Sequence, residues 1–160
     1  MICSLQLLAI AHAEQLLYTL SCEPDQLTVA QSALLLAYGA DPLSQTDKGA
    51  RFWILVALNF CYHQKMLKYS GATSENSFAP NRQECKRLWW SCFVLDHVLA
   101  MKDDQVPCIR TSEWDVPMID IDDFEVPGLL NREYYWPMRA LAMTFLEKCQ
   151  LCMQVSLKFI

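Results

Sequence analysis

The sequence predicts an all-α fold, an irregular array of about five helices that is part of a larger helical domain. Apolar residues recur at helical spacing over long segments, and no stretch alternates like a half-buried strand. Apolar residues make up 53% of the chain and charged residues 19%, against about 45–50% and about 25% in ordinary soluble domains. Such a surplus indicates surface that further chain or a partner covers. We therefore interpret residues 1–160 as a fragment.

The first two helices are expected at Ile2–Leu20 and Leu27–Tyr38. Good helix formers with leucines near one face predict the first helix, and a proline-containing stretch ends it. Asp25 or Thr28 is placed to cap the second helix, which stops at Gly39.

The next two helices are expected to form the centre of the fold. The third begins near Asp47 or Lys48 and runs to about Tyr69, and its apolar residues fall on all sides, which is typical of a buried helix. The fourth runs from about Arg82 to Met101 and is mostly apolar after a charged start. We expect the other elements to pack around these two.

An acidic, proline-containing connection follows, from Asp103 to Pro127, and a last helix spans about residues 131–159. Three prolines and no helical period predict an ordered but irregular segment. Asp120, Asp122 and Asp123 could suggest a calcium loop, but the glycine at the turn and the closing glutamate of such a loop are missing. A solvated acidic turn is favoured.

Charge and cysteine usage exclude several classes of function. The net charge is −5 and the first basic residue is Lys48, so we expect no direct binding of nucleic acid. The longest apolar run, Phe52–Leu58, is far shorter than the roughly 20 residues that span a bilayer. The eight cysteines could form a secreted disulfide framework, but several lie in apolar helical patterns, which favours free thiols in the cytosol or nucleus.

The N-terminus offers one pattern of a targeting signal. Met1–Ala13 ends in a small-x-small sequence like the cleavage site of a secretory peptide. No basic residue precedes the apolar stretch and the helical spacing continues beyond it. We therefore expect the chain to open within a helix.

No catalytic or metal-binding residues are assigned. Cys149 and Cys152 could be a redox pair or half a zinc site, but without a second pair two buried cysteines are favoured. Ser91 and His97 lie six residues apart on different helical faces, which gives no nucleophile geometry.

Two polar residues share one apolar face of the third helix. Asn59 and His63 are four residues apart, so their side chains are neighbours. The simpler interpretation is a buried pair with satisfied hydrogen bonds, and the sharper one is a contact to an effector or a partner.

The most specific pattern begins at Lys86 with Lys-Arg-Leu-Trp-Trp-Ser-Cys-Phe-Val-Leu-Asp and continues in the connection with Asp-Val-Pro. It resembles the middle region of fungal transcription factors of the binuclear zinc cluster (Zn2Cys6) family. Coverage is about residues 27–125, with departures at Cys61, Gln64 and 103–105. The acidic variant at 115–124 resembles the cutinase-regulator branch. The residues that match the family pattern are Arg87, Leu88, Trp89, Trp90, Ser91, Asp96, Asp115, Val116 and Pro117.

The resemblance implies a nuclear, helical regulatory domain, not an enzyme, that lies between a zinc cluster and an activation region. It implies no cofactor in this chain, because the zinc belongs to an N-terminal cluster outside these residues. The implied partners are the remainder of the same transcription factor, a second copy, and a small-molecule inducer, with DNA bound only through the zinc cluster and no membrane. A helical interaction scaffold and a helical enzyme fragment remain as alternatives, but solenoid repeats and clustered acid-base groups are both missing.

Asp96 falls on an apolar side of the fourth helix, where a charge needs a partner. We expect an arginine such as Arg51 or Arg110, or backbone N–H groups at a helix start. Its role would be structural, joining this helix to the connection.

Overall fold

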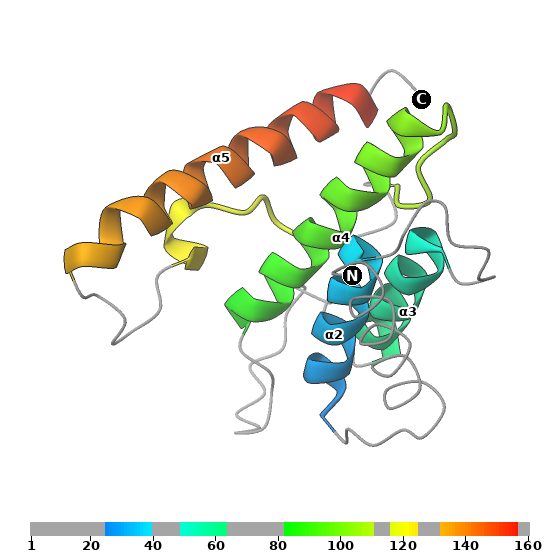
Figure 1. Cartoon of the computed structure of the whole chain (residues 1–160), viewed down its shortest axis with the longest axis horizontal. Coiled ribbons are helices and arrows are strands. Elements are labelled where there is room, and N and C mark those ends of the chain that lie inside the picture. The colour runs from blue at the N-terminus through cyan, green and yellow to red at the C-terminus, as the bar shows by residue number, and fades with distance from the viewer. Residues whose placement is uncertain (1–24, 40–48, 64–81, 111–115, 125–131, 157–160) are drawn as a thin grey trace, which may run out of the picture. The chain divides into compact units, whose positions relative to one another are not determined.

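The computed structural model describes residues 25–39, 49–63, 82–110, 116–124 and 132–156. These residues form four α-helices and one 3-10 helix and contain no strand, which confirms the all-α prediction (Figure 1). The expected helix at Ile2–Leu20 lies outside the described residues. The elements are α2 (Gln26–Gly39), α3 (Ala50–His63), α4 (Arg82–Lys102), η3 (Ile121–Phe124) and α5 (Arg132–Ser156).

The chain divides into two compact units, residues 1–65 and 66–160. In the first unit α2 and α3 pack together. Asp25 caps α2: its carboxylate accepts hydrogen bonds from the Thr28 N–H at 2.9 Å and the Thr28 hydroxyl at 2.5 Å. The hydroxyl bond, followed by the backbone bond, lowers the pKa of Asp25. Of the two expected caps, the structure selects Asp25.

The α3 helix is buried on one side only. Trp53, Ile54 and Ala57 are buried, whereas the Leu55 side chain is 52% exposed. The expectation of a helix buried on all sides is therefore wrong. Apolar residues lie all around α3, whereas α2 packs against one side of it.

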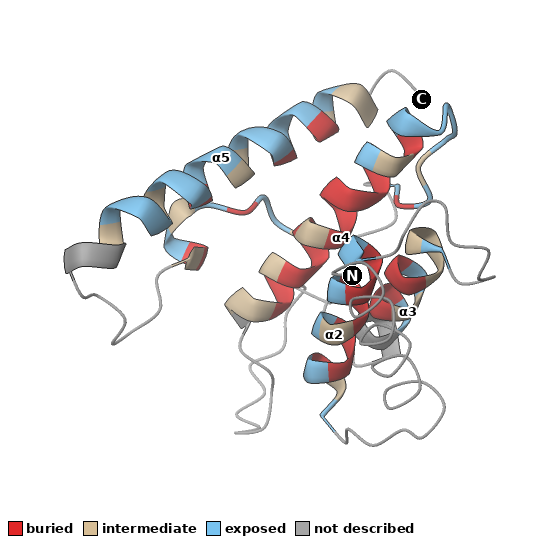
Figure 2. Cartoon of the chain, viewed as in Figure 1, coloured by how far each residue is buried: buried red, intermediate tan, exposed pale blue. Residues whose placement is uncertain are grey.

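In the second unit, η3 packs against both α4 and α5 (Figure 1). Figure 2 shows that α4 is buried over most of its length, whereas one side of α5 is exposed from Trp136 to Gln154. At the end of α4 the Gln105 N–H donates to the Ala100 carbonyl at 2.9 Å, while Asp104 adopts φ 50°. This is a Schellman ending with aspartate where glycine is usual. The helix therefore stops at Lys102, one residue beyond the expected end.

Candidate functional site

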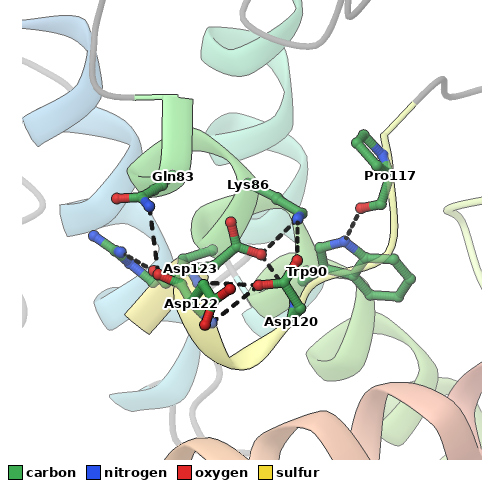
Figure 3. Close-up of polar contacts among 8 residues, drawn as sticks. Gln83, Lys86, Trp90, Pro117, Asp120, Asp122 and Asp123 are labelled. Carbon is green, nitrogen blue, oxygen red and sulfur yellow. Dashed lines mark hydrogen bonds and ion pairs between the residues drawn. The ribbon is translucent and has the colours of Figure 1, made fainter. Parts of the chain in front are cut away.

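A row of donors on α4 holds the connection (Figure 3). Gln83, Lys86, Arg87 and Trp90 share one helical face because they lie three or four residues apart. Every one of them contacts the segment 116–124, which we call the strap. Trp90 Nε1 donates to the Pro117 carbonyl at 3.0 Å, and Gln83 Nε2 donates to the Asp122 carbonyl at 3.4 Å. The earlier residue Gln83 contacts the later part of the strap and Trp90 contacts its beginning, so α4 and the strap run antiparallel.

The central contact is an ion pair. Lys86 Nζ lies 2.5 Å from Asp123 Oδ2 and 3.5 Å from Asp120 Oδ2, and Arg87 donates to the Asp123 carbonyl. Burial by itself lowers the pKa of Lys86, but the hydrogen bonds and charges of Asp123 and Asp120 outweigh it and leave the pKa raised. The ammonium therefore stays charged in the folded protein.

The same acids build η3. The Asp120 carboxylate accepts from the N–H groups of Asp122 at 3.0 Å and Asp123 at 3.3 Å. In return, Asp123 Oδ2 accepts from the Asp120 N–H at 2.9 Å. This reciprocal pair is a capping box made of two aspartates. Asp123 is buried, so the expectation of a solvated acidic turn is wrong at that position: a lysine 37 positions earlier in the chain neutralises its charge.

The second half of α4 holds another part of the connection through Asp96, which is 1% exposed. Asp96 Oδ2 accepts from the Ile109 N–H at 2.9 Å, and Oδ1 has no hydrogen-bond partner among the described residues. The partner is thus a backbone amide, as one expectation had it, but it belongs to an irregular segment and not to a helix start. The carboxylate joins α4 to the start of the connection.

His97 joins α4 to the end of α5. Its Nδ1 lies 2.8 Å from the Phe93 carbonyl and its Nε2 contacts the Ser156 hydroxyl. A carbonyl only accepts, so Nδ1 carries the hydrogen and Nε2 accepts from Ser156. Sequence reasoning considered His97 only as a partner of Ser91, whose hydroxyl instead donates to the Arg87 carbonyl at 2.8 Å. The available signal was a histidine one turn after Phe93 on an apolar helix.

Burial lowers the pKa of His97 below its ordinary 6.5, although the bond to Phe93 and the charge of Asp96 act in the opposite direction. The unfolded chain therefore binds this proton at a higher pH than the folded chain does. The contribution of His97 to stability is present above pH 6.5 and is lost as the pH falls through the folded pKa.

The residues that carry the family resemblance lie mainly in this region. Leu88, Trp89 and Trp90 are buried, and Trp89 stacks on Phe93 with ring centroids 5.4 Å apart. Pro117 is exposed at its side chain and supplies the carbonyl that Trp90 binds. Val116 is half-buried, and Asp115 lies outside the described residues.

The other expected site residues do not join this region. Asn59 is exposed, so the interpretation of a buried polar pair is wrong for it, and the side chain of His63 lies outside the described residues. Cys149 and Cys152 are buried, and burial, with the neighbouring Cys152, raises the pKa of Cys149 to about 12. Such a thiol carries little thiolate at neutral pH, which argues against a redox pair.

The described ranges contain no group of three or more His, Cys, Asp or Glu side chains arranged to hold a metal ion. Within the same ranges, no helix combines the length and the apolar character needed to cross a membrane.

Comparisons with known proteins identify the family. The chain matches the family described as "Fungal specific transcription factor domain" over residues 5–139. It is 30% identical over 154 residues to "Cutinase transcription factor 1 beta" of Fusarium vanettenii, which covers 89% of this chain and 17% of that protein. It is 26% identical over 136 residues to "Cutinase transcription factor 1 alpha" of the same organism, covering 85% and 15%.

A protein of Fusarium pseudograminearum named "Transcription factor" is 30% identical over 112 residues, covering 70% of this chain and 12% of the relative. The chain spans less than a fifth of the length of each of these relatives. No solved structure matches it significantly. The family and these relatives are transcription factors by description, not enzymes. The chain therefore belongs to the fungal-specific transcription factor domain family, in the branch of the cutinase regulators.

Proposed function

We propose that residues 1–160 act as a regulatory part of a nuclear transcription factor whose DNA contacts are made by a zinc cluster outside them. The observation that carries this proposal is the match to the family over residues 5–139. The net charge of −5 supports the division of labour, because DNA phosphates are bound by positively charged surfaces and an acidic chain is repelled by them.

Regulation in this proposal means that the domain biases the attached activator between masked and active states. The bias comes from an effector, a second copy or a protein partner that binds one state better than the other. The exposed Asn59 on α3 remains our candidate for such a contact, together with His63. No zinc or other cofactor is needed by this chain itself.

A reporter assay tests the regulatory role. Residues 1–160 are placed between a heterologous DNA-binding domain and an activation region in fungal cells, and output is compared with a fusion that lacks them. We expect the insertion to change output, and the Asp96→Ala variant, which we expect to be destabilised, to reduce or abolish that change. Equal output with and without the insertion contradicts the proposal.

A gel-shift titration of the 160-residue chain at low salt, with elemental analysis of the same sample, tests the division of labour. We expect no sequence-selective complex and no stoichiometric metal. Tight, selective binding of DNA by the chain alone would overturn the assignment of DNA contacts to another part of the protein.

A further inference from the structure

α5 is held in the second unit by direct contact with α4 and by contact with η3. Near its C-terminal end the Ser156 hydroxyl bonds His97 of α4. Close to the middle of α5, Phe145 packs edge-on against Phe124 of η3, with ring centroids 5.9 Å apart. Figure 1 shows η3 beside the first half of α5, while the last turns of α5 approach the end of α4. Besides the direct contact between α4 and α5, the strap thus gives a second connection between the two helices, at the first half and middle of α5.

The first half of α5 buries little apolar surface of its own. Among its described side chains Ala142 is buried, but Trp136, Met138 and Leu141 are 71%, 56% and 67% exposed. In the second half Leu151 is exposed, but Cys149 and Cys152 are buried. Because hydrophobic stabilisation grows with the apolar area removed from water, the first half is the more weakly held. Segments with few buried contacts open at a lower free energy than the rest of a fold.

The strap itself is held mostly by polar contacts from α4, and one of them joins two full charges. Gln83, Arg87 and Trp90 donate hydrogen bonds to backbone carbonyls of the strap. After release of the strap, water can form hydrogen bonds with these carbonyls instead. The Lys86–Asp123 pair differs because both side chains are about nine-tenths buried. If one charge is removed, the other is buried without a partner. Water stabilises such a charge, so release of the strap from α4 becomes more favourable.

We propose that residues 116–124 form a releasable clasp that couples the first half of α5 to α4, with the Lys86–Asp123 ion pair as its closing contact. When the pair opens, the strap and the first half of α5 separate from α4 together. The bond between His97 and Ser156 keeps the second half of α5 in place. This proposal concerns the chain itself and stands or falls independently of the proposed function.

Hydrogen exchange of the full 160-residue chain, followed by mass spectrometry, tests the clasp. In Lys86→Met we expect exchange of 116–124 and 135–147 to rise together, on the order of tenfold, with 149–156 unchanged. Lys86→Arg restores the charge and should return both segments toward wild-type protection. Ser156→Ala is the matched control at the other attachment and should raise exchange in 149–156 while the strap stays protected.

Two results would overturn the proposal. Exchange that rises in the strap of Lys86→Met but not in 135–147 means that the strap does not couple α5 to α4. Exchange that rises equally throughout α4 and α5 means that the second unit opens as one body. If Lys86→Met does not fold, Asp123→Asn takes its place, because it removes the charge of Asp123 and keeps a side-chain oxygen that caps η3. Hydrogen exchange of the wild-type chain at low denaturant gives a further test. There, residues 116–124 and 135–147 must open with one common free energy, which is lower than that of α4.

Discussion

The two halves of α4 join distant segments in different ways. In the first half, long side chains form a row along the strap. Asp123 of the strap forms an ion pair with Lys86 and accepts a hydrogen bond from Arg87 at its backbone carbonyl. In the second half, Asp96 and His97 are each 1% exposed, and each makes one contact to a distant segment. In the first half, neighbouring side chains still hold the strap when one contact is lost. In the second half, no neighbouring contact described above replaces the bond that Asp96 or His97 makes. The second half should therefore be the more sensitive to substitution.

The largest effect is expected at Asp96. Asp96→Ala leaves the buried Ile109 N–H without its charged acceptor and should cost on the order of 3 kcal/mol of the free energy of unfolding. Asp96→Asn keeps one carbonyl oxygen for that N–H and should cost about 1 kcal/mol. Chemical denaturation measures both. A folded Asp96→Ala variant with unchanged melting that loses regulation in the longer protein would instead assign Asp96 to a ligand site.

Lys86→Met should come next, at about 2 kcal/mol, because it leaves the buried Asp123 carboxylate without its cation. The value is lower than at Asp96 because Arg87 still holds the strap at the Asp123 carbonyl. Asp120→Asn is the matched control, since Asp120 is 61% exposed and lies 3.5 Å from Lys86. A loss as large in the control as in Lys86→Met would show that the charge of Asp120, and not that of the buried Asp123, is the partner through which Lys86 stabilises the strap.

Trp90→Phe removes the bond to the Pro117 carbonyl while keeping most of the buried ring, and should cost about 1 kcal/mol. Ser91→Ala serves as its control, because among the described residues the Ser91 hydroxyl bonds within α4, to the Arg87 carbonyl. Thermal melting compares the two variants. Equal melting temperatures would mean that the indole bond contributes nothing to holding the strap.

The smallest effect is a gain at the end of α4. Asp104 has φ 50°, a conformation that glycine adopts without steric cost, so Asp104→Gly should stabilise the fold by about 0.5 kcal/mol. The control is Asp103→Gly, where φ is not positive and glycine should destabilise. Denaturation of the paired variants checks the sign, and a loss in both would contradict the Schellman geometry.

The amino-acid sequence determined the helices with useful accuracy. The expected 27–38 and 82–101 became Gln26–Gly39 and Arg82–Lys102, because helical periodicity and capping residues are local signals. Likewise, the Leu-Trp-Trp-Ser and Asp-Val-Pro patterns indicated the family, and the match to the family confirmed it. The aspartates of 120–123 were predicted to form a turn, but their ion pairs with Lys86 were not predicted.

Only the tertiary structure decided which segments meet. Asp123 looked solvated in sequence because no cation lies within helical reach of it. His97 was missed because its partner, Ser156, lies 59 positions away. Periodicity reports which face of one element is apolar, whereas ion pairs and buried hydrogen bonds between elements depend on the path of the chain between them. That path is set by the packing of all elements at once, and no local pattern encodes it.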